Sequence, residues 1–553
     1  MKIVAAALLL VVSRSMFGAG LPSEQDRLIA AGRLWVTVKY FHPHLAYRKD
    51  IDWDKALVEA LPKIRAAHTE DEYSVAVRAM LDRLGDQKIE QNSPSHRTWI
   101  HYGPNRSAFA VEAGPSIENI PIHMGGGLQV KVRLSEPLST NAAAYPDPPA
   151  DRSYSEALYP STEYRILAAY KLWGAIRNFF GYRDLMDDDW DQDFSEFLPR
   201  FIAAKDAREY NLAVAEAVTH LHDSNAEMAS QEMDEYFGRA APGLRLRLVE
   251  KKPLITEILD GAATSAGVQV GDIVTRVDDE EIVARINREA ALISASTQQA
   301  LGASVMRRIL NGPDGSEALL TVRAHDGATK EIRLKRTIIH EDQPRQSEPM
   351  KLLSSRIGYV DLGGISESQI NAMFENFAGT AAIIFDARGP LQLDPSLLGS
   401  RLTDKPDVAG AIITGPISLR PDVTSRRSLT DTASFFRVEA LPPSSFPIYQ
   451  GKTAMLIDER TKGAAEHLGL LLEAANKTAF IGSLSAGADS EIATLVLPGG
   501  IIIRYSDCDI RHGNSGKLQR VGLEPTVAVS PALADVRAGR DVVLEKAVEY
   551  LSR

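Results

Sequence analysis

Two serines and one histidine late in the chain have the residue types needed to attack a carbonyl carbon. Ser483 and Ser485 follow an apolar segment, and His512 closes the segment that begins at Asp507. A serine hydroxyl becomes a nucleophile when an imidazole accepts its proton. The set therefore predicts acyl transfer if the fold brings these groups together. The alternative is that the serines cap backbone groups, as loop serines commonly do.

Other reactive residue types have simpler structural interpretations. Asp386 and Arg388 follow an apolar run, and we expect them to form an ion pair at the end of a strand. Cys508 is the only cysteine, so it cannot form an internal disulfide, and we expect it to be buried as a small apolar residue. We predict no metal and no cofactor.

The chain over 350–553 has the pattern of an α/β domain. Near-continuous apolar runs at 357–362, 381–386 and 452–458 are each followed by a helix-like segment. Strands that are buried on both faces of a sheet have this pattern. We predict that the largest core of the protein lies here.

A different pattern covers 235–340. Short alternating strands are separated by Gly-Asp turns, and a helix is predicted from about Gln298 to Leu310. These features predict a small β domain.

The first half of the chain contains an internal repeat. Leu34-Trp35 recurs as Leu172-Trp173, and Asp52-Trp53 recurs as Asp189-Trp190. Both copies place apolar residues at helical spacing. We predict two helical hairpin modules, over 21–92 and 161–234, separated by a small β unit over 93–134 and a Pro/Ser-rich linker over 135–160.

The N-terminus has the pattern of a secretory signal peptide. Residues 1–20 combine one lysine, an apolar run from Ile3 to Val12 and small residues before Leu21. We predict cleavage near Leu21 and a periplasmic or extracellular protein, with an uncleaved anchor or a disordered start as the alternative. The run is too short to span a membrane, so no membrane span is predicted.

The composition is that of a globular protein with several domains. Of 553 residues, 44% are hydrophobic and 24% are charged, and the formal net charge is -11. No Lys/Arg-rich stripe with interleaved aromatics is present in the sequence, which argues against a nucleic-acid partner. The oligomeric state is not indicated.

Four segments resemble motifs of the tail-specific, or C-terminal processing, serine peptidases. They are FDARG at Phe385–Gly389, LIDERT at Leu456–Thr461, VGLEP at Val521–Pro525 and RAGRD at Arg537–Asp541. The segment AGVQVGDIVTRVDD at Ala266–Asp279 resembles a PDZ domain. The resemblance covers nearly all of the mature chain and is to the tricorn-like branch.

This resemblance implies a multidomain α+β fold. Duplicated helical hairpin modules would precede a PDZ-like β domain and a C-terminal α/β, crotonase-like peptidase core. In PDZ domains, an extended peptide or protein tail adds to the edge of the sheet, and backbone N–H groups before the first strand hold its carboxylate. The matching residues here are Gly243, Leu244 and Arg245.

At the matching catalytic positions, this sequence lacks the nucleophile, the base and the acid. The family places its serine three residues before the Glu of an "AE" pair, which here gives Gly463, and glycine has no side chain to attack a carbonyl. The lysine base of the tail-specific branch is replaced by Ala488. The histidine base of the tricorn branch is replaced by Asn225, whose amide cannot accept a proton, and its acidic partner by Gln519.

By the same resemblance, Ala464 and Gly389 are the candidate oxyanion-site residues. Two hypotheses follow. The first is a catalytically degenerate member of the family that binds a peptide or protein tail. The second is an active serine-type peptidase that uses the displaced groups Ser483 or Ser485 with His512.

Overall fold

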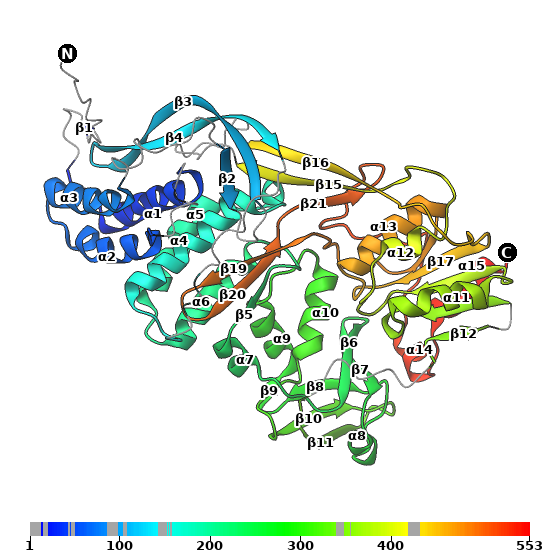
Figure 1. The fold of residues 1–553 in the computed structure, drawn as a ribbon. Coiled ribbons are helices and arrows are strands. Elements are labelled where there is room, and N and C mark those ends of the chain that lie inside the picture. Colours follow the sequence, from blue (N-terminus) through cyan, green and yellow to red (C-terminus); the bar gives the residue numbers. More distant parts are fainter. Residues whose placement is uncertain are drawn as a thin grey trace. The chain divides into compact units, whose positions relative to one another are not determined.

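The computed structural model describes residues 13–14, 20–42, 45, 50–85, 98–102, 108–141, 152, 154, 157–338, 348–353, 356–418 and 432–553 (Figure 1). The chain forms two compact units. Unit 1 comprises 1–217, 415–435 and 493–503, and unit 2 comprises 218–414, 436–492 and 504–553. Within the described residues, no helix is both long enough and apolar enough to cross a membrane.

Unit 1 contains the internal repeat as two sets of three helices, coloured blue and cyan in Figure 1. The first set is α1 (Glu24–Phe41), α2 (Trp53–Ala66) and α3 (Glu70–Leu81), followed by the short η2 (Asp82–Leu84). The second set is α4 (Thr162–Phe179), η4 (Arg183–Leu185), α5 (Trp190–Ala203) and α6 (Ala207–Thr219).

The two sets share the same internal anchors. The indole N–H of Trp53 donates to the carbonyl of Trp35 at 3.1 Å, and that of Trp190 donates to Trp173 at 3.0 Å. A buried arginine on the first helix of each set bonds to the end of the second helix: Arg27 to Ile64 O at 2.9 Å, and Arg165 to Phe201 O at 2.8 Å. The repeat predicted from sequence is therefore a structural repeat.

A β-sheet lies between the two helical sets in the sequence. Its order is β1-β4-β3-β2, with β1 (Ser13–Arg14), β2 (Thr98–Tyr102), β3 (Ala108–Gly125) and β4 (Leu128–Asn141). The long hairpin of β3 and β4 turns through Gly125, Gly126 and Gly127, which all have positive φ. The strand β4 continues beyond residue 135, where the linker was predicted to begin.

Unit 2 begins with β5 (Glu227–Ala229) and α7 (Gln231–Phe237), followed by an antiparallel sheet of order β11-β10-β8-β7-β6. Its elements are β6 (Leu244–Val249), β7 (Lys252–Ile258), α8 (Gly261–Ser265), β8 (Ile273–Val277), β9 (Glu280–Glu281), α9 (Ile282–Ala290), α10 (Gln298–Arg308), β10 (Glu317–Arg323) and β11 (Thr329–Lys335). The predicted helix from Gln298 is confirmed as α10. Because β6 ends the strand order, one of its edges carries no strand of the described chain.

The rest of unit 2 is a mixed α/β core. Its sheet has the order β12-β13-β14-β17-β18-β22, and every pair from β13 onward is parallel. The strands are β12 (Met350–Leu352), β13 (Ile357–Asp361), β14 (Ala382–Asp386), β17 (Lys452–Ile457), β18 (Ala479–Gly482) and β22 (Val527–Ala528). All five residues of β14 are buried, as the continuous apolar run predicts.

Helices and three further strands complete this core. The helices are η5 (Leu362–Gly364), η6 (Glu367–Gln369), α11 (Ile370–Phe377), α12 (Ser396–Gly399), α13 (Ala464–Asn476), α14 (Leu533–Arg537) and α15 (Val542–Leu551). The strand β21 (Asp509–His512) pairs with β15 (Ala409–Ser418), and β16 (Thr432–Ala440) lies beside β15. The strands β19 (Ile492–Leu497) and β20 (Ile501–Ser506) follow β18 in the sequence, and most of their residues belong to unit 1. The sheet packs on α15 through Val543, Ala547 and Leu551.

Candidate functional site

A sharp turn joins β17 to α13, and Gly463 is its last residue before the helix. Gly463 has φ 57° and ψ -122°, a conformation that L-amino acids rarely adopt. A Cβ built on it would meet nothing nearer than the Ala488 carbonyl oxygen at 4.0 Å. Strand-to-helix turns of this strained kind carry the nucleophile in other hydrolase folds. The predicted nucleophile position therefore has the shape and the space for a side chain, but no side chain.

Glu466, one turn into α13, fixes the loop opposite Gly463. Its carboxylate accepts the backbone N–H of Gly487 at 2.7 Å and that of Ala488 at 2.9 Å. The Gly463 N–H donates to the Ala488 carbonyl at 3.0 Å. Glu466 is fully buried, and burial raises its pKa to about 7. Ala488, the predicted lysine position, thus lies against Gly463 and offers only backbone groups.

Asn225 and Gln519 meet on a buried carboxylate, that of Asp223. The Asn225 N–H donates to Asp223 Oδ1 at 3.0 Å, and Gln519 Nε2 donates to the same oxygen at 3.4 Å. Asn225 Nδ2 donates to Ser506 Oγ at 3.2 Å, and Ser506 N donates to Asp223 Oδ2 at 3.1 Å. The two residues predicted as base and acid positions therefore lie side by side, although almost 300 residues separate them in the sequence.

Lys462 connects this cluster to the turn at Gly463. Its Nζ donates to the Ser224 carbonyl at 2.5 Å, so the residue before Gly463 contacts the residue before Asn225. Burial lowers the pKa of Lys462. Lys462 thus links the Gly463–Ala488 contact to the segment that carries Asp223 and Asn225. The sequence interpretation missed Lys462; a lysine directly before the predicted nucleophile position is the signal that could have found it.

No protein-family model and no curated protein sequence matches the chain. Among solved structures, mature CPAF matches with a TM-score of 0.54 at 13% identity, covering 71% of this chain and 98% of that chain. Mature CPAF complexed with lactacystin matches with a TM-score of 0.52 at 12% identity, covering 71% and 98%. The chain has the tail-specific peptidase fold. The photosystem II D1 C-terminal processing protease matches at 14% identity over 68% of this chain and 97% of that chain, with a TM-score of 0.40.

In this tail-specific peptidase fold, the displaced groups are not assembled into a catalytic pair. Ser485 is fully buried; its hydroxyl donates to Glu466 and accepts from the Leu523 N–H at 2.6 Å. His512 Nδ1 lies 2.7 Å from Glu473 Oε2. Among the described residues, neither Ser483 nor Ser485 is a hydrogen-bond partner of His512. Ser485 instead caps backbone groups, which was the alternative interpretation.

The histidine next to Glu466 is held as a cation. His467 Nδ1 lies 2.8 Å from Asp489 Oδ2, and Nε2 lies 3.2 Å from Glu439 Oε2. Burial alone would lower the pKa of His467, but these two carboxylates raise it to about 10. A charged imidazole with both nitrogens bonded has no free site to accept a proton, so His467 serves to tie α13 to the loop at Asp489.

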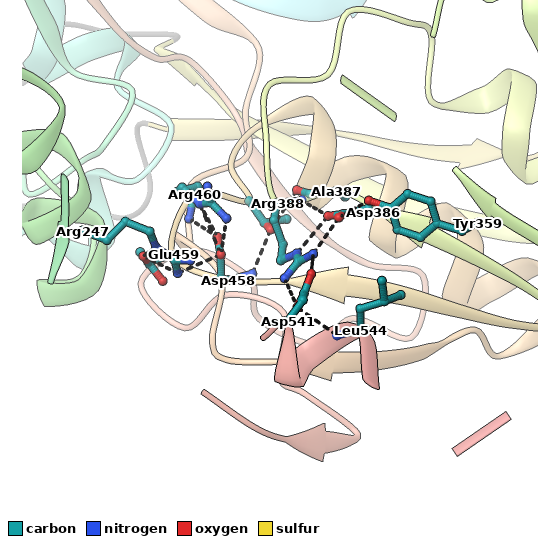
Figure 2. A network of polar contacts seen from close by, with 11 residues as sticks. Arg247, Tyr359, Asp386, Ala387, Arg388, Asp458, Glu459, Arg460, Asp541 and Leu544 are labelled. Atoms are coloured by element: carbon teal, nitrogen blue, oxygen red, sulfur yellow. Dashed lines mark hydrogen bonds and ion pairs between the residues drawn. The ribbon is translucent and has the colours of Figure 1, made fainter. Parts of the chain in front are cut away.

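Two ion-pair networks stand at the carboxyl ends of β14 and β17 (Figure 2). Arg388 pairs with Asp386 at 2.7 Å, which confirms the predicted ion pair, and with Asp541 at 2.7 Å. Tyr359 donates to Asp386 at 2.8 Å. In the second network, Arg460 bonds to Asp458 at 2.7 Å.

The two candidate oxyanion residues, Ala464 and Gly389, follow turns that a hydrogen bond of Thr461 joins. Thr461 Oγ1 donates to the Ala387 carbonyl at 3.0 Å, which joins the turn before Gly463 to the turn that contains Gly389. Ala464 is the first residue of α13, and the first-turn N–H groups of a helix have no intrahelical acceptor. The backbone could therefore still present an N–H to a developing oxyanion, without a nucleophile to create one.

The predicted peptide-binding residues begin the edge strand β6. Leu244 N donates to the Pro242 carbonyl at 2.6 Å, so this N–H is not free to hold a carboxylate. Gly243 O accepts from Leu259 N at 2.7 Å, and a Cβ on Gly243 would lie 2.1 Å from Asp260 Oδ2. Arg245 is half exposed and faces Glu257 at 3.4 Å.

The β domain also contacts the loop that faces Gly463. At the start of α10, Thr297 Oγ1 donates to the Ala486 carbonyl at 2.9 Å and Gln299 Nε2 donates to the Ser485 carbonyl at 3.1 Å. On β6, Arg247 pairs with Asp458 at 2.9 Å and with Glu459 at 2.8 Å (Figure 2). The edge strand is thus attached to the end of β17 that leads into the candidate site.

Proposed function

We propose that this chain is a catalytically inactive protein with the tail-specific peptidase fold, which binds an extended peptide or protein tail without cutting it. The observation that carries the proposal is Gly463: its turn has room for a side chain and has none. Without a hydroxyl or thiol at this position, no covalent acyl intermediate can form.

The missing base supports the same conclusion. Asn225 has an amide with no titratable nitrogen, and the sequence resemblance matches it to the histidine position of the tricorn-like branch. Lys462 has a lowered pKa, but its amine is bonded to the Ser224 carbonyl and has no hydroxyl to deprotonate. In serine peptidases, losing members of the catalytic set reduces turnover by about 10⁴ to 10⁶.

The peptide partner is argued from the β domain. The sequence of 235–340 and the position of β6 at the end of its sheet support a PDZ-like domain, in which a tail adds as one more strand. Because Leu244 N is already bonded, main-chain pairing along β6 contributes more to binding than capture of a carboxylate at Gly243. The core is then crotonase-like, and the mature protein works in the periplasm or outside the cell.

A fluorophosphonate probe tests the inactive state. The mature protein should show no labelled serine and no cleavage of an unstructured casein substrate. The double variant Gly463→Ser with Asn225→His should gain labelling at residue 463, whereas Gly261→Ser, at an exposed glycine with nothing within 4 Å of its Cβ, should not. Labelling of Ser483 or Ser485 in the unmodified protein would instead establish the displaced-pair peptidase.

Peptide binding is tested separately. We expect a display library of free C-terminal peptides to yield a ligand whose affinity falls at least tenfold in Gly243→Ala, because the new Cβ displaces Asp260 beside β6. The matched variant Gly261→Ala should bind as the unmodified protein does. Equal binding by both variants, or no enriched peptide, would contradict the assignment of β6 as the docking edge.

A further inference from the structure

A polar cavity lies in the α/β part of unit 2. It is at the start of β17 and the end of α13, whereas the candidate site is at the end of β17 and the start of α13. Its volume is about 430 Å³, and it is lined by the start of β17, the end of α13, the end of α15 and the loop after α12. Since α13 has 13 residues, its two ends lie about 20 Å apart. Gly463 begins that helix and the cavity is at its end, so the two sites are separate. The volume is in the range of about 300–1,000 Å³ that small-molecule sites occupy.

Three lysines line this cavity: Lys405 from the loop after α12, Lys452 from the start of β17 and Lys477 from the end of α13. Within the described part of the chain, no carboxylate forms an ion pair with any of the three. Lys477 alone could be explained by the helix terminus, where a cation is favourable. Lys405 and Lys452 belong to other elements and have no such explanation. In a protein of net charge -11, three unpaired ammonium groups around one hollow form a local positive site.

Asn476 provides oriented donors between the lysines. Its Oδ1 accepts from the Thr453 hydroxyl at 3.0 Å and from the Thr478 hydroxyl at 2.7 Å. These bonds orient the amide with its oxygen toward the threonines, and the donor Nδ2 has no acceptor among the described residues. The only carboxylate that lines the cavity is that of Asp404, which leaves a net positive lining.

We propose that this cavity binds a small polyanion that carries at least two negative charges on oxygen, either a phosphorylated compound or a polycarboxylate. Lysine ammonium groups bind compact anionic oxygens as point charges. The lining residues include no arginine, whose planar guanidinium would favour bidentate binding of a single carboxylate. This site is independent of peptide binding and of the catalytic state of the turn at Gly463.

Titration calorimetry on the mature protein tests the site, with pyrophosphate and citrate as the two probes. We expect saturable one-site binding of at least one probe, weakened when salt rises from 50 to 200 mM. Pyrophosphate binding with no citrate binding identifies a phosphorylated ligand class, and the reverse identifies a polycarboxylate. No saturation by either probe at about 10 mM, a concentration above most small-ligand dissociation constants, would overturn the proposal.

Two variants locate the binding. Lys405→Gln with Lys452→Gln and Lys477→Gln should weaken it at least tenfold, while a matched control that removes three exposed lysines of the β domain should change it less than twofold. The control substitutions are Lys251→Gln, Lys330→Gln and Lys335→Gln. Asn476→Asp keeps the acceptor for both threonines but replaces the donors with a negative charge, and it should abolish binding without lowering the melting temperature by more than a few degrees. Equal weakening by the two triple variants would show that only net charge attracts the probe, and would overturn the site.

Discussion

At the residue scale, the candidate site is defined by the groups that each position offers. Gly463 keeps the turn and the space of a nucleophile, Asn225 keeps a hydrogen-bonding group without basicity, and Gln519 keeps a donor without charge. Asn225 and Gln519 are buried, and both bond to Asp223. The cluster therefore holds unit 2 together even though it lacks the groups for proton transfer.

His467 gives a pH-dependent prediction at this scale. Its pKa is about 10 in the folded chain, against 6.5 ordinarily, so the fold favours the charged form. The stabilisation is fully present below about pH 6.5 and is lost as pH rises toward 10. We expect His467→Gln to lower the free energy of unfolding at pH 6 by about 3 kcal/mol, because it leaves Asp489 buried without its cation.

Urea denaturation at pH 6, 8 and 10 measures this effect. The deficit of the variant should shrink as pH rises, and a deficit that is the same at all three values would contradict the ion-pair account. The control is His512→Gln, whose partner Glu473 has a side chain that is 42% exposed, and it should cost less than about 1 kcal/mol.

At the element scale, the turn between β17 and α13 is the point where separate parts of unit 2 meet. Asp458 pairs with Arg247 of the β domain, Thr461 donates to the carbonyl of Ala387, directly after β14, and Lys462 donates to the carbonyl of Ser224. Burial alone would raise the pKa of Asp458, but Arg247 and Arg460 hold it below its usual value. A buried carboxylate between two guanidinium groups thus connects the edge strand to the core.

Arg247→Ala should therefore destabilise unit 2. It removes one of the two cations that face Asp458, which is nearly buried, and we expect a loss of about 1–3 kcal/mol. Chemical denaturation measures the loss. Arg245→Ala, on the same strand, removes an exposed pair with Glu257 and should cost less than about 1 kcal/mol. Equal effects of the two substitutions would show that the contact with β17 is not a stabilising one.

Sequence patterns predicted the helices and strands, but they did not predict the contacts between them. The apolar runs predicted β13, β14 and β17 because burial on both faces leaves no polar positions, and a helix was predicted from about Gln298, where α10 begins. The meeting of Asn225 with Gln519 depends on chain segments far apart in sequence, which periodicity does not encode. The family resemblance supplied those positions, and Lys462 and His467, which carry no motif of catalytic chemistry, were missed.

At the scale of the whole molecule, the duplicated helices show how the chain was built. The repeated Trp–carbonyl and Arg–carbonyl bonds of unit 1 are the same in both copies, although most other residues differ. Only the second copy leads directly into Asp223 and Asn225. Within unit 1 the two copies pack on each other, where α1 lies against α4.

The predicted export belongs to this scale as well. Expression of the full chain in a Gram-negative bacterium should give a periplasmic protein whose N-terminus, read by mass spectrometry, lies near Leu21. Replacing an apolar residue in the run from Ile3 to Val12, as in Leu9→Arg, should keep the protein in the cytoplasm and uncleaved. The exposed change Leu352→Arg, in the mature chain, is the control and should not alter export. An intact N-terminus in the unmodified protein would contradict the signal peptide.

The carboxylate of Glu466 holds the turn before α13 in place although the turn carries no nucleophilic side chain. It accepts hydrogen bonds from the N–H groups of Gly487 and Ala488, and the backbone of Gly463 has a strained conformation although this residue has no side chain. The backbone geometry of this turn does not depend on a reacting side chain. The turn by itself is therefore evidence of fold, and only the side chains that it carries are evidence of turnover.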